Sequence, residues 1–93
     1  MKLIKLTNYG SAMVDDDRYE ELNHYSWYRQ KLWGKYVALR NGGPGEPAIV
    51  SMHRQVAGVT DSKILVGHID SNGLNNQRAN LQVGRPTRSK GGQ

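Results

Sequence analysis

The fold of this chain is decided by residues 66–81, which read VGHIDSNGLNNQRANL. The apolar run 64–69 predicts a strand, and Asp70–Gly73 is dense in turn-forming residues. In the next segment, residues 74–81, two leucines stand seven positions apart with mostly polar residues between them, which is typical of a short one-faced helix. The sequence therefore predicts a strand that delivers a histidine into a tight loop, followed by a short helix.

The predicted helix contains three asparagines within six residues, Asn75, Asn76 and Asn80. Asparagine lowers helix propensity, and a buried amide needs partners for both its oxygen and its nitrogen. Stability alone does not favour such an array, so we expect a functional role for these asparagines and for His68. The simpler alternative for His68 is a loop histidine whose ring satisfies a turn.

The N-terminal half predicts short antiparallel elements. Lys2–Thr7 alternates apolar and polar residues as a strand does, the turn Asn8–Gly10 stops it, and Ser11–Val14 is expected to pair with it. The acids Asp15–Asp17 are expected to cap a helix that begins near residue 18, rather than to form a metal site.

The middle of the chain predicts a second hairpin and a short helix. Trp27–Leu32 and Lys35–Arg40 are rich in aromatic and β-branched residues and are expected to be its two strands. A short strand around Ala48–Val50 is expected to lead into a helix over Met52–Ala57, which Gly58 would close. Trp27 is expected in the core because the chain has no phenylalanine, whereas Tyr28, Trp33 and Tyr36 could stack on bases.

Several of these segments together resemble the phage- and intron-encoded HNH (homing) endonucleases. In that family a strand ending in Asp-His is joined by a turn to a helix bearing Asn and then Asn-Leu. Met52-His53-Arg54 is similar to the Met-His-Arg before that motif. Lys5-Leu6-Thr7 through Val14-Asp15-Asp16, and Tyr25 to Trp27, resemble its N-terminal half. The resemblance covers about residues 3 to 81.

The resemblance implies an α+β fold: N-terminal antiparallel β hairpins with a short helix, followed by a C-terminal ββα-metal (HNH) motif. We expect a single domain with a β-rich part over residues 1–50, the HNH motif over 51–83 and a flexible basic tail over 84–93. It also implies a phage-encoded nuclease in the cytoplasm of a bacterial host, with DNA as its partner. A protein partner or a homo-oligomer stays open.

The resemblance also implies catalytic roles for His68 and Asn75. His68 would be the general base that deprotonates the attacking water, and Asn75 would hold the loop and strand in register. Asn80 would bind a divalent metal, Mg²⁺ or Mn²⁺, which stabilises charge on the scissile phosphate. A neutral imidazole accepts a proton near pH 7, and hard cations prefer oxygen ligands.

The chain departs from the family at residue 67, where Gly67 replaces the Asp that serves as the anionic metal ligand. Mg²⁺ is usually held by one or two carboxylates together with phosphate oxygens, so this replacement predicts a poor metal site and weak or lost cleavage. Asp70 is the alternative carboxylate, although it lies beyond the strand end. Two functions therefore remain open: a metal-dependent DNA endonuclease that nicks one strand, and an inactive HNH-derived DNA-binding or regulatory protein.

Charge supports a polyanionic partner. The net charge is +5, and residues 1–24 hold three Lys/Arg against five Asp/Glu, whereas residues 78–93 contain no acid. His53 is expected to be structural or to contact phosphate. The chain has no cysteine, which excludes disulfides and thiolate chemistry, and no signal peptide or membrane-spanning run is expected. The residues expected to contact DNA are Arg54, Arg78, Arg85, Arg88 and Lys90.

Overall fold

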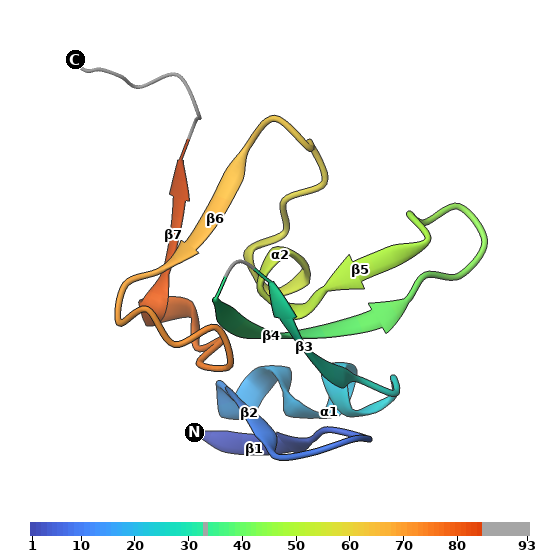
Figure 1. The fold of residues 1–93 in the computed structure, drawn as a ribbon, viewed down its shortest axis with the longest axis vertical. Helices are drawn as coiled ribbons and strands as arrows, with labels where there is room; N and C mark the ends of the chain where they lie inside the picture. Colours follow the sequence, from blue (N-terminus) through green and yellow to red (C-terminus); the bar gives the residue numbers. More distant parts are fainter. Residues whose placement is uncertain (33, 85–93) are drawn as a thin grey trace.

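The computed structural model describes residues 1–32 and 34–84 and shows a small α+β domain with antiparallel sheets and short helices. The α+β class predicted from the sequence is thus confirmed. Figure 1 shows the β1–β2 hairpin at the bottom, the β3–β4–β5 sheet across the middle and the β6–β7 hairpin at the top, with α2 between the last two. Within the described residues, no helix is long and apolar enough to cross a membrane.

The N-terminal hairpin pairs β1 (Lys2–Lys5) with β2 (Ser11–Val14), in register from Lys2 opposite Val14 to Lys5 opposite Ser11. The turn ends at Gly10, whose positive φ of 77° suits glycine because it has no Cβ. Period-two alternation buries Ile4, Ala12 and Val14, while the residues between them are more exposed. The predicted first hairpin is therefore confirmed.

A 3-10 helix, η1 (Asp16–Arg18), and the helix α1 (Tyr19–Asn23) follow this hairpin. Asp15 is the N-cap residue of η1 with Asp16 and Asp17 in the first turn, as predicted, but its side chain makes no cap hydrogen bond. The Asp15 carboxylate instead accepts a hydrogen bond from the backbone N–H of Arg78, 2.8 Å away. A long-range backbone partner has thus replaced the local one.

The central sheet contains β3 (Tyr28–Leu32), β4 (Lys35–Asn41) and β5 (Ile49–Ser51), which run antiparallel in that order. The helix α2 (Met52–Ala57) begins directly after β5 and ends at Gly58, whose left-handed φ is 73°. The second hairpin, the short strand and the glycine-closed helix predicted from the sequence are therefore confirmed.

The core lies where these elements meet. Trp27 is fully buried and its indole N–H donates to the carbonyl of Leu22 at 2.7 Å, so its one polar atom is satisfied. Burying so large a side chain is a main source of apolar stabilisation in a short chain. The core residues are Ile4, Leu6, Ala12, Val14, Leu22, Trp27, Ala38, Met52 and Val56.

The C-terminal hairpin pairs β6 (Leu65–His68) with β7 (Leu81–Gly84). The strand ending in a histidine is confirmed, but the helix predicted over residues 74–81 is wrong. That segment contains a β-bridge between Asn75 and Met13 and a 3-10 helix, η2 (Arg78–Asn80), before it enters β7. Its two leucines still pack against the core, so their spacing indicates which residues are buried and not a helical conformation. Gly84 belongs to β7, and the rest of the predicted tail lies outside the described residues.

Candidate functional site

The candidate site is the loop between β6 and β7, which His68 opens. His68 is the last residue of β6 and pairs with Leu81 of β7. One residue later, the backbone N–H of Ile69 donates to the carbonyl of Asn80 at 2.8 Å, which keeps the two strands together at the base of the loop. The hairpin thus holds the backbone of His68 in a defined place at the loop entrance.

The loop is closed by the Asp70 carboxylate. It accepts hydrogen bonds from Nδ2 of Asn75 at 2.9 Å, from Nδ2 of Asn80 at 2.8 Å and from the backbone N–H of Asn72 at 2.9 Å. These bonds, the one from Asn75 first, lower the pKa of Asp70 below its usual value because they favour the ionised carboxyl group. Asp70 therefore acts as a hub that ties the two sides of the loop together.

Asn80 uses both ends of its amide within this loop. Its Oδ1 accepts from the backbone N–H of Asp70 at 3.1 Å, and its Nδ2 also donates to the carbonyl of Asn75 at 2.9 Å. The sequence suggested bracing for Asn75 and metal binding for Asn80 and Asp70. The geometry brings all three together in one network and gives Asn80 the largest bracing role, while Asn75 contributes through Asp70 and Gln77.

The side chain that contacts His68 is Asn76, to which the sequence reasoning gave no role of its own. Nε2 of His68 lies 2.8 Å from Oδ1 of Asn76. An amide oxygen can only accept, so this contact is a hydrogen bond in the tautomer whose Nε2 carries the proton, and that tautomer leaves Nδ1 as the acceptor. Asn76 is fully buried, and its backbone N–H donates to the carbonyl of Met13 at 2.7 Å. The sequence singled out the asparagines, but it did not show which of them would face His68, because that depends on the conformation of the loop.

A second histidine lies against the first. The rings of His53, on α2, and His68 are 4.9 Å apart between centroids and meet edge to face. Burial, followed by the nearby His68 and Arg54, lowers the pKa of His53 to about 4. Nδ1 of His53 and Nδ2 of Asn76 are buried without a hydrogen-bond partner among the described residues. His53 is therefore a neutral packing neighbour of His68 near pH 7.

The residues around His68 do not fit a divalent metal of the kind that the HNH resemblance implies. Gly67 supplies no ligand, and the Asp70 carboxylate is occupied by three donors of its own loop. Across residues 1–32 and 34–84, no group of three or more His, Cys, Asp or Glu side chains lies close enough together to hold a metal ion. Asn80, for which the resemblance implied metal binding, uses both ends of its amide within the loop.

The two described arginines expected to contact DNA are both engaged inside the protein. Arg54 donates from Nη1 to the carbonyl of Ile64 at 2.7 Å and from Nη2 to the carbonyl of Asp61 at 2.6 Å, which holds the segment between α2 and β6. Arg78 pairs with Asp15 at 3.2 Å and with Asp17 at 2.8 Å. The other three expected contacts, Arg85, Arg88 and Lys90, lie outside the described residues.

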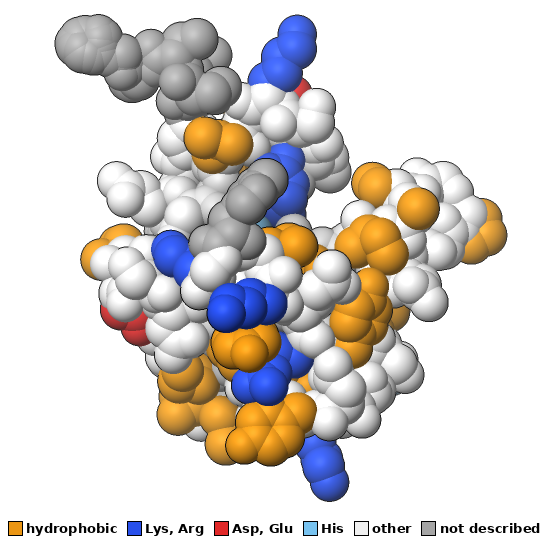
Figure 2. All heavy atoms as spheres, viewed as in Figure 1, with side chains coloured by type: hydrophobic (Ala, Val, Ile, Leu, Met, Phe, Trp, Pro, Cys, Tyr) orange, Lys and Arg blue, Asp and Glu red, His pale blue; other side chains and the backbone are white. Residues whose placement is uncertain are grey.

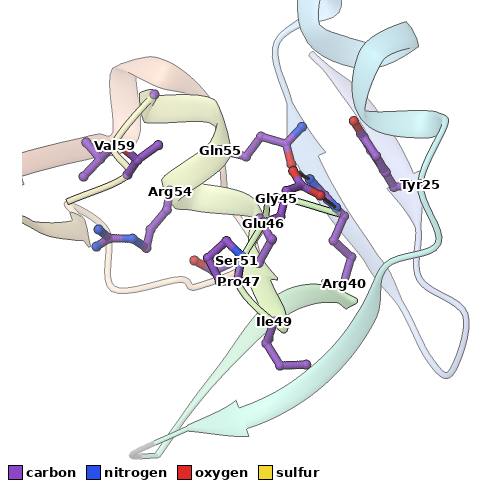
Figure 3. Close-up of a pocket in the computed structure, with 13 residues that line it drawn as sticks. Tyr25, Arg40, Gly45, Glu46, Pro47, Ile49, Ser51, Arg54, Gln55 and Val59 are labelled. Carbon is purple, nitrogen blue, oxygen red and sulfur yellow. Dashed lines mark hydrogen bonds and ion pairs between the residues drawn. The ribbon is translucent and has the colours of Figure 1, made fainter. Parts of the chain in front are cut away.

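A separate cavity of about 600 Å³ lies between the β4–β5 hairpin and α2 (Figure 3). The buried Arg40 points into it and pairs with Glu46 at 2.8 Å, and its guanidinium stacks 3.9 Å from the centroid of the Tyr25 ring. Hydrogen bonds from Arg40 lower the pKa of Glu46 to about 2. Because Arg40 and Glu46 neutralise each other, neither charge is left for a charged ligand in this cavity.

Comparison with known proteins adds no relative to this picture. No protein-family model, no curated protein and no solved structure matches the chain.

Proposed function

We propose that this chain is a DNA-binding protein of the HNH endonuclease type, whose centre keeps the general-base histidine but lacks the carboxylate beside it. The observation that carries the proposal is the pairing of His68 with Asn76 at the entrance of a loop closed by Asp70 and Asn80. A turn histidine would not need a fully buried amide to orient its ring. The strand that ends in His68 is in keeping with the family resemblance, whereas the helix that the resemblance places after it is replaced by η2 and β7.

The chain's own residues supply one element of phosphodiester hydrolysis. With Nε2 engaged by Asn76, Nδ1 of His68 can accept the proton of an attacking water. A positioned general base contributes about 10² to 10⁴ in rate, which is only part of what this reaction needs. Residue 67 is glycine, so it supplies no carboxylate to hold a metal ion that would stabilise charge on the leaving oxygen. Binding without efficient cleavage is the function that follows.

The second candidate function is an active nicking endonuclease, and the oriented His68 ring favours it. The two functions are separated by restoring the carboxylate with Gly67→Asp. A side chain fits there, since a Cβ built on Gly67 meets no atom within 4 Å. A loss of folding is therefore not the expected outcome of this change.

The experiment is relaxation of a supercoiled plasmid by the unaltered chain and by Gly67→Asp, each with Mg²⁺ or Mn²⁺. Nicking should appear or rise strongly in Gly67→Asp, and the double variant Gly67→Asp with His68→Ala should lose most of that gain, about 10² to 10⁴ in rate. Gly67→Asn is the matched control, because it adds the same volume without the charge. If the unaltered chain cuts the plasmid as fast as Gly67→Asp does, the hypothesis of an active nuclease is the correct one.

DNA binding itself is tested by its salt dependence. If Lys and Arg side chains neutralise phosphates, the affinity for DNA should fall with salt at a log-log slope of about −0.9 per phosphate contacted. Truncation after Gly84 keeps β7 intact and should flatten the slope by removing Arg85, Arg88 and Lys90. Absence of binding at low salt would remove DNA as the partner.

A further inference from the structure

A column of basic and aromatic side chains crosses the β3–β4 hairpin and the neighbouring turn after β1. The Arg29 guanidinium lies 4.3 Å from the centroid of the Tyr9 ring and 4.0 Å from that of Tyr36, and Nζ of Lys31 lies 5.9 Å from the Tyr36 centroid. We call these four residues, Tyr9, Arg29, Lys31 and Tyr36, the ladder. Figure 2 shows Lys/Arg and hydrophobic side chains alternating over β3 and β4 on this face.

The ladder is held in place by the backbone beneath it. Asn8 bonds both backbone groups of Arg29: its Nδ2 donates to the carbonyl and its Oδ1 accepts from the N–H, each at 2.8 Å. Next to it, the N–H of Thr7 donates to the carbonyl of the buried Trp27 at 2.8 Å. Lys31 stands opposite Tyr36 in the strand register, so both lie on one face. A surface organised in this way loses little conformational freedom on binding.

The positive charge of the ladder is not neutralised. Residues 22–45 contain no Asp or Glu. In the part of the chain that the structure describes, no carboxylate lies within ion-pairing distance of Arg29, Lys31 or Lys35, whereas Arg18, Arg40 and Arg78 each have one. Arg29 and Lys31 lie on one face two residues apart on β3, and such unpaired cations attract an extended polyanion.

The ladder also presents aromatic ring faces to solvent. Tyr9 is 67% exposed and Tyr36 is 42% exposed. The guanidinium of Arg29 covers one face of each ring, which leaves the opposite face of the strongly exposed Tyr9 ring for another flat group. Nucleic acid is the polyanion that carries flat rings, and its bases can stack on a side chain only when they are not paired within a duplex.

We propose that the ladder binds single-stranded nucleic acid, with an unpaired base stacked on Tyr9 and the phosphates beside Arg29 and Lys31. This inference rests on the proposed DNA-binding function and deepens it by naming an unpaired strand as the ligand of one surface. The ladder adjoins the candidate site, because Gly73 of the β6–β7 loop packs directly on the backbone oxygen of Tyr36, where a Cβ would clash.

The test measures fluorescence anisotropy of a labelled oligothymidylate and of a labelled duplex of equal length, with the full chain. The unaltered chain should bind the single strand, and Tyr9→Leu should weaken that binding about 5- to 150-fold, which corresponds to the usual contribution of one stacked base. Tyr9→Phe should restore it, since the ring face is kept. Arg29→Gln should weaken binding and flatten its salt dependence by about one phosphate.

The matched charge control is Lys63→Ala, an exposed residue on the segment between α2 and β6, which should leave single-strand affinity almost unchanged. If Tyr9→Leu and Arg29→Gln melt normally and bind the single strand as the unaltered chain does, the ladder is not the site. Duplex binding that these variants leave intact would then preserve the proposed function and reject only this inference. If the unaltered chain binds neither the single strand nor the duplex, both the proposed function and this inference are rejected. Equal competition by polyglutamate would show that the ladder selects charge and not bases.

Discussion

The β6–β7 loop and the β3–β4 hairpin are both rich in polar side chains, but they use them in opposite ways. In the loop, Asp70, Asn75 and Asn80 bond to one another, and Arg78 pairs with acids of the N-terminal segment. On the hairpin, Arg29 and Lys31 lie beside tyrosine rings without a carboxylate among the described residues. The polar side chains of a dense motif can therefore use up their hydrogen bonds on one another. The strand pair β3–β4, with fewer such bonds, keeps cations and aromatic rings that a ligand can contact.

The largest expected effect on stability comes from breaking the loop with Asn80→Ala. This change leaves the N–H of Asp70, its carboxylate and the carbonyl of Asn75 without one partner each. The free energy of unfolding should fall by about 1 to 3 kcal/mol, measured by urea denaturation. Asn23→Ala, an exposed asparagine at the end of α1, should change it by less than about 0.5 kcal/mol. Equal effects of the two variants would show that the network does not brace the loop.

The second effect is a pH dependence of stability, to which the buried His53 contributes through its lowered pKa. Burial lowers the pKa of His53 to about 4 in the folded protein, against about 6.5 in an unfolded chain. The unfolded chain therefore binds more protons below pH 6.5, and stability falls as the pH drops toward 4, by up to about 1.4 kcal/mol per pH unit.

Urea denaturation between pH 7 and about 5.5 measures this slope above most of the range in which ordinary carboxyl groups titrate. His53→Gln should flatten the slope, whereas Arg29→Ala should leave it unchanged because the ladder contains neither a histidine nor a carboxylate. A slope that persists in His53→Gln would place the titrating group elsewhere.

Removing the ladder cation should separate binding from stability. Arg29→Ala loses contacts to two exposed tyrosine rings, which cost about 1 kcal/mol or less. Its affinity for single-stranded DNA should nevertheless drop clearly. Thermal unfolding and anisotropy on the same preparation check both. A fall in stability as large as that of Asn80→Ala would mean that Arg29 is a structural residue.

The smallest effect is expected for Arg78→Ala. The ion pairs of Arg78 with Asp15 and Asp17 are largely exposed, and such pairs contribute about 0.2 to 1 kcal/mol. Because these acids already neutralise the guanidinium, the salt dependence of DNA binding should stay as it is in the unaltered chain. A slope reduced by about one phosphate would return Arg78 to the DNA contacts that the sequence suggested.

Local patterns in the sequence were sufficient where a segment satisfies itself. Alternation and turn residues predicted the first hairpin, aromatic and β-branched residues predicted the second, and Gly58 marked the end of α2. Each of these signals depends on neighbouring residues. The strand that ends at His68 was predicted in the same way. The α+β class, which the family resemblance implied, agrees with these elements.

Only the tertiary structure decided the partners of the polar side chains. The leucine spacing of residues 74–81 could not show that Met13 and Asp15 would capture the backbone of this segment and prevent a helix. Nor could composition separate Arg78, neutralised by acids about 60 positions earlier, from Arg29, which has tyrosine rings as neighbours. Such pairings depend on which distant elements pack together. The sequence therefore specifies the elements, but the partner of each charged side chain is set only by the tertiary structure.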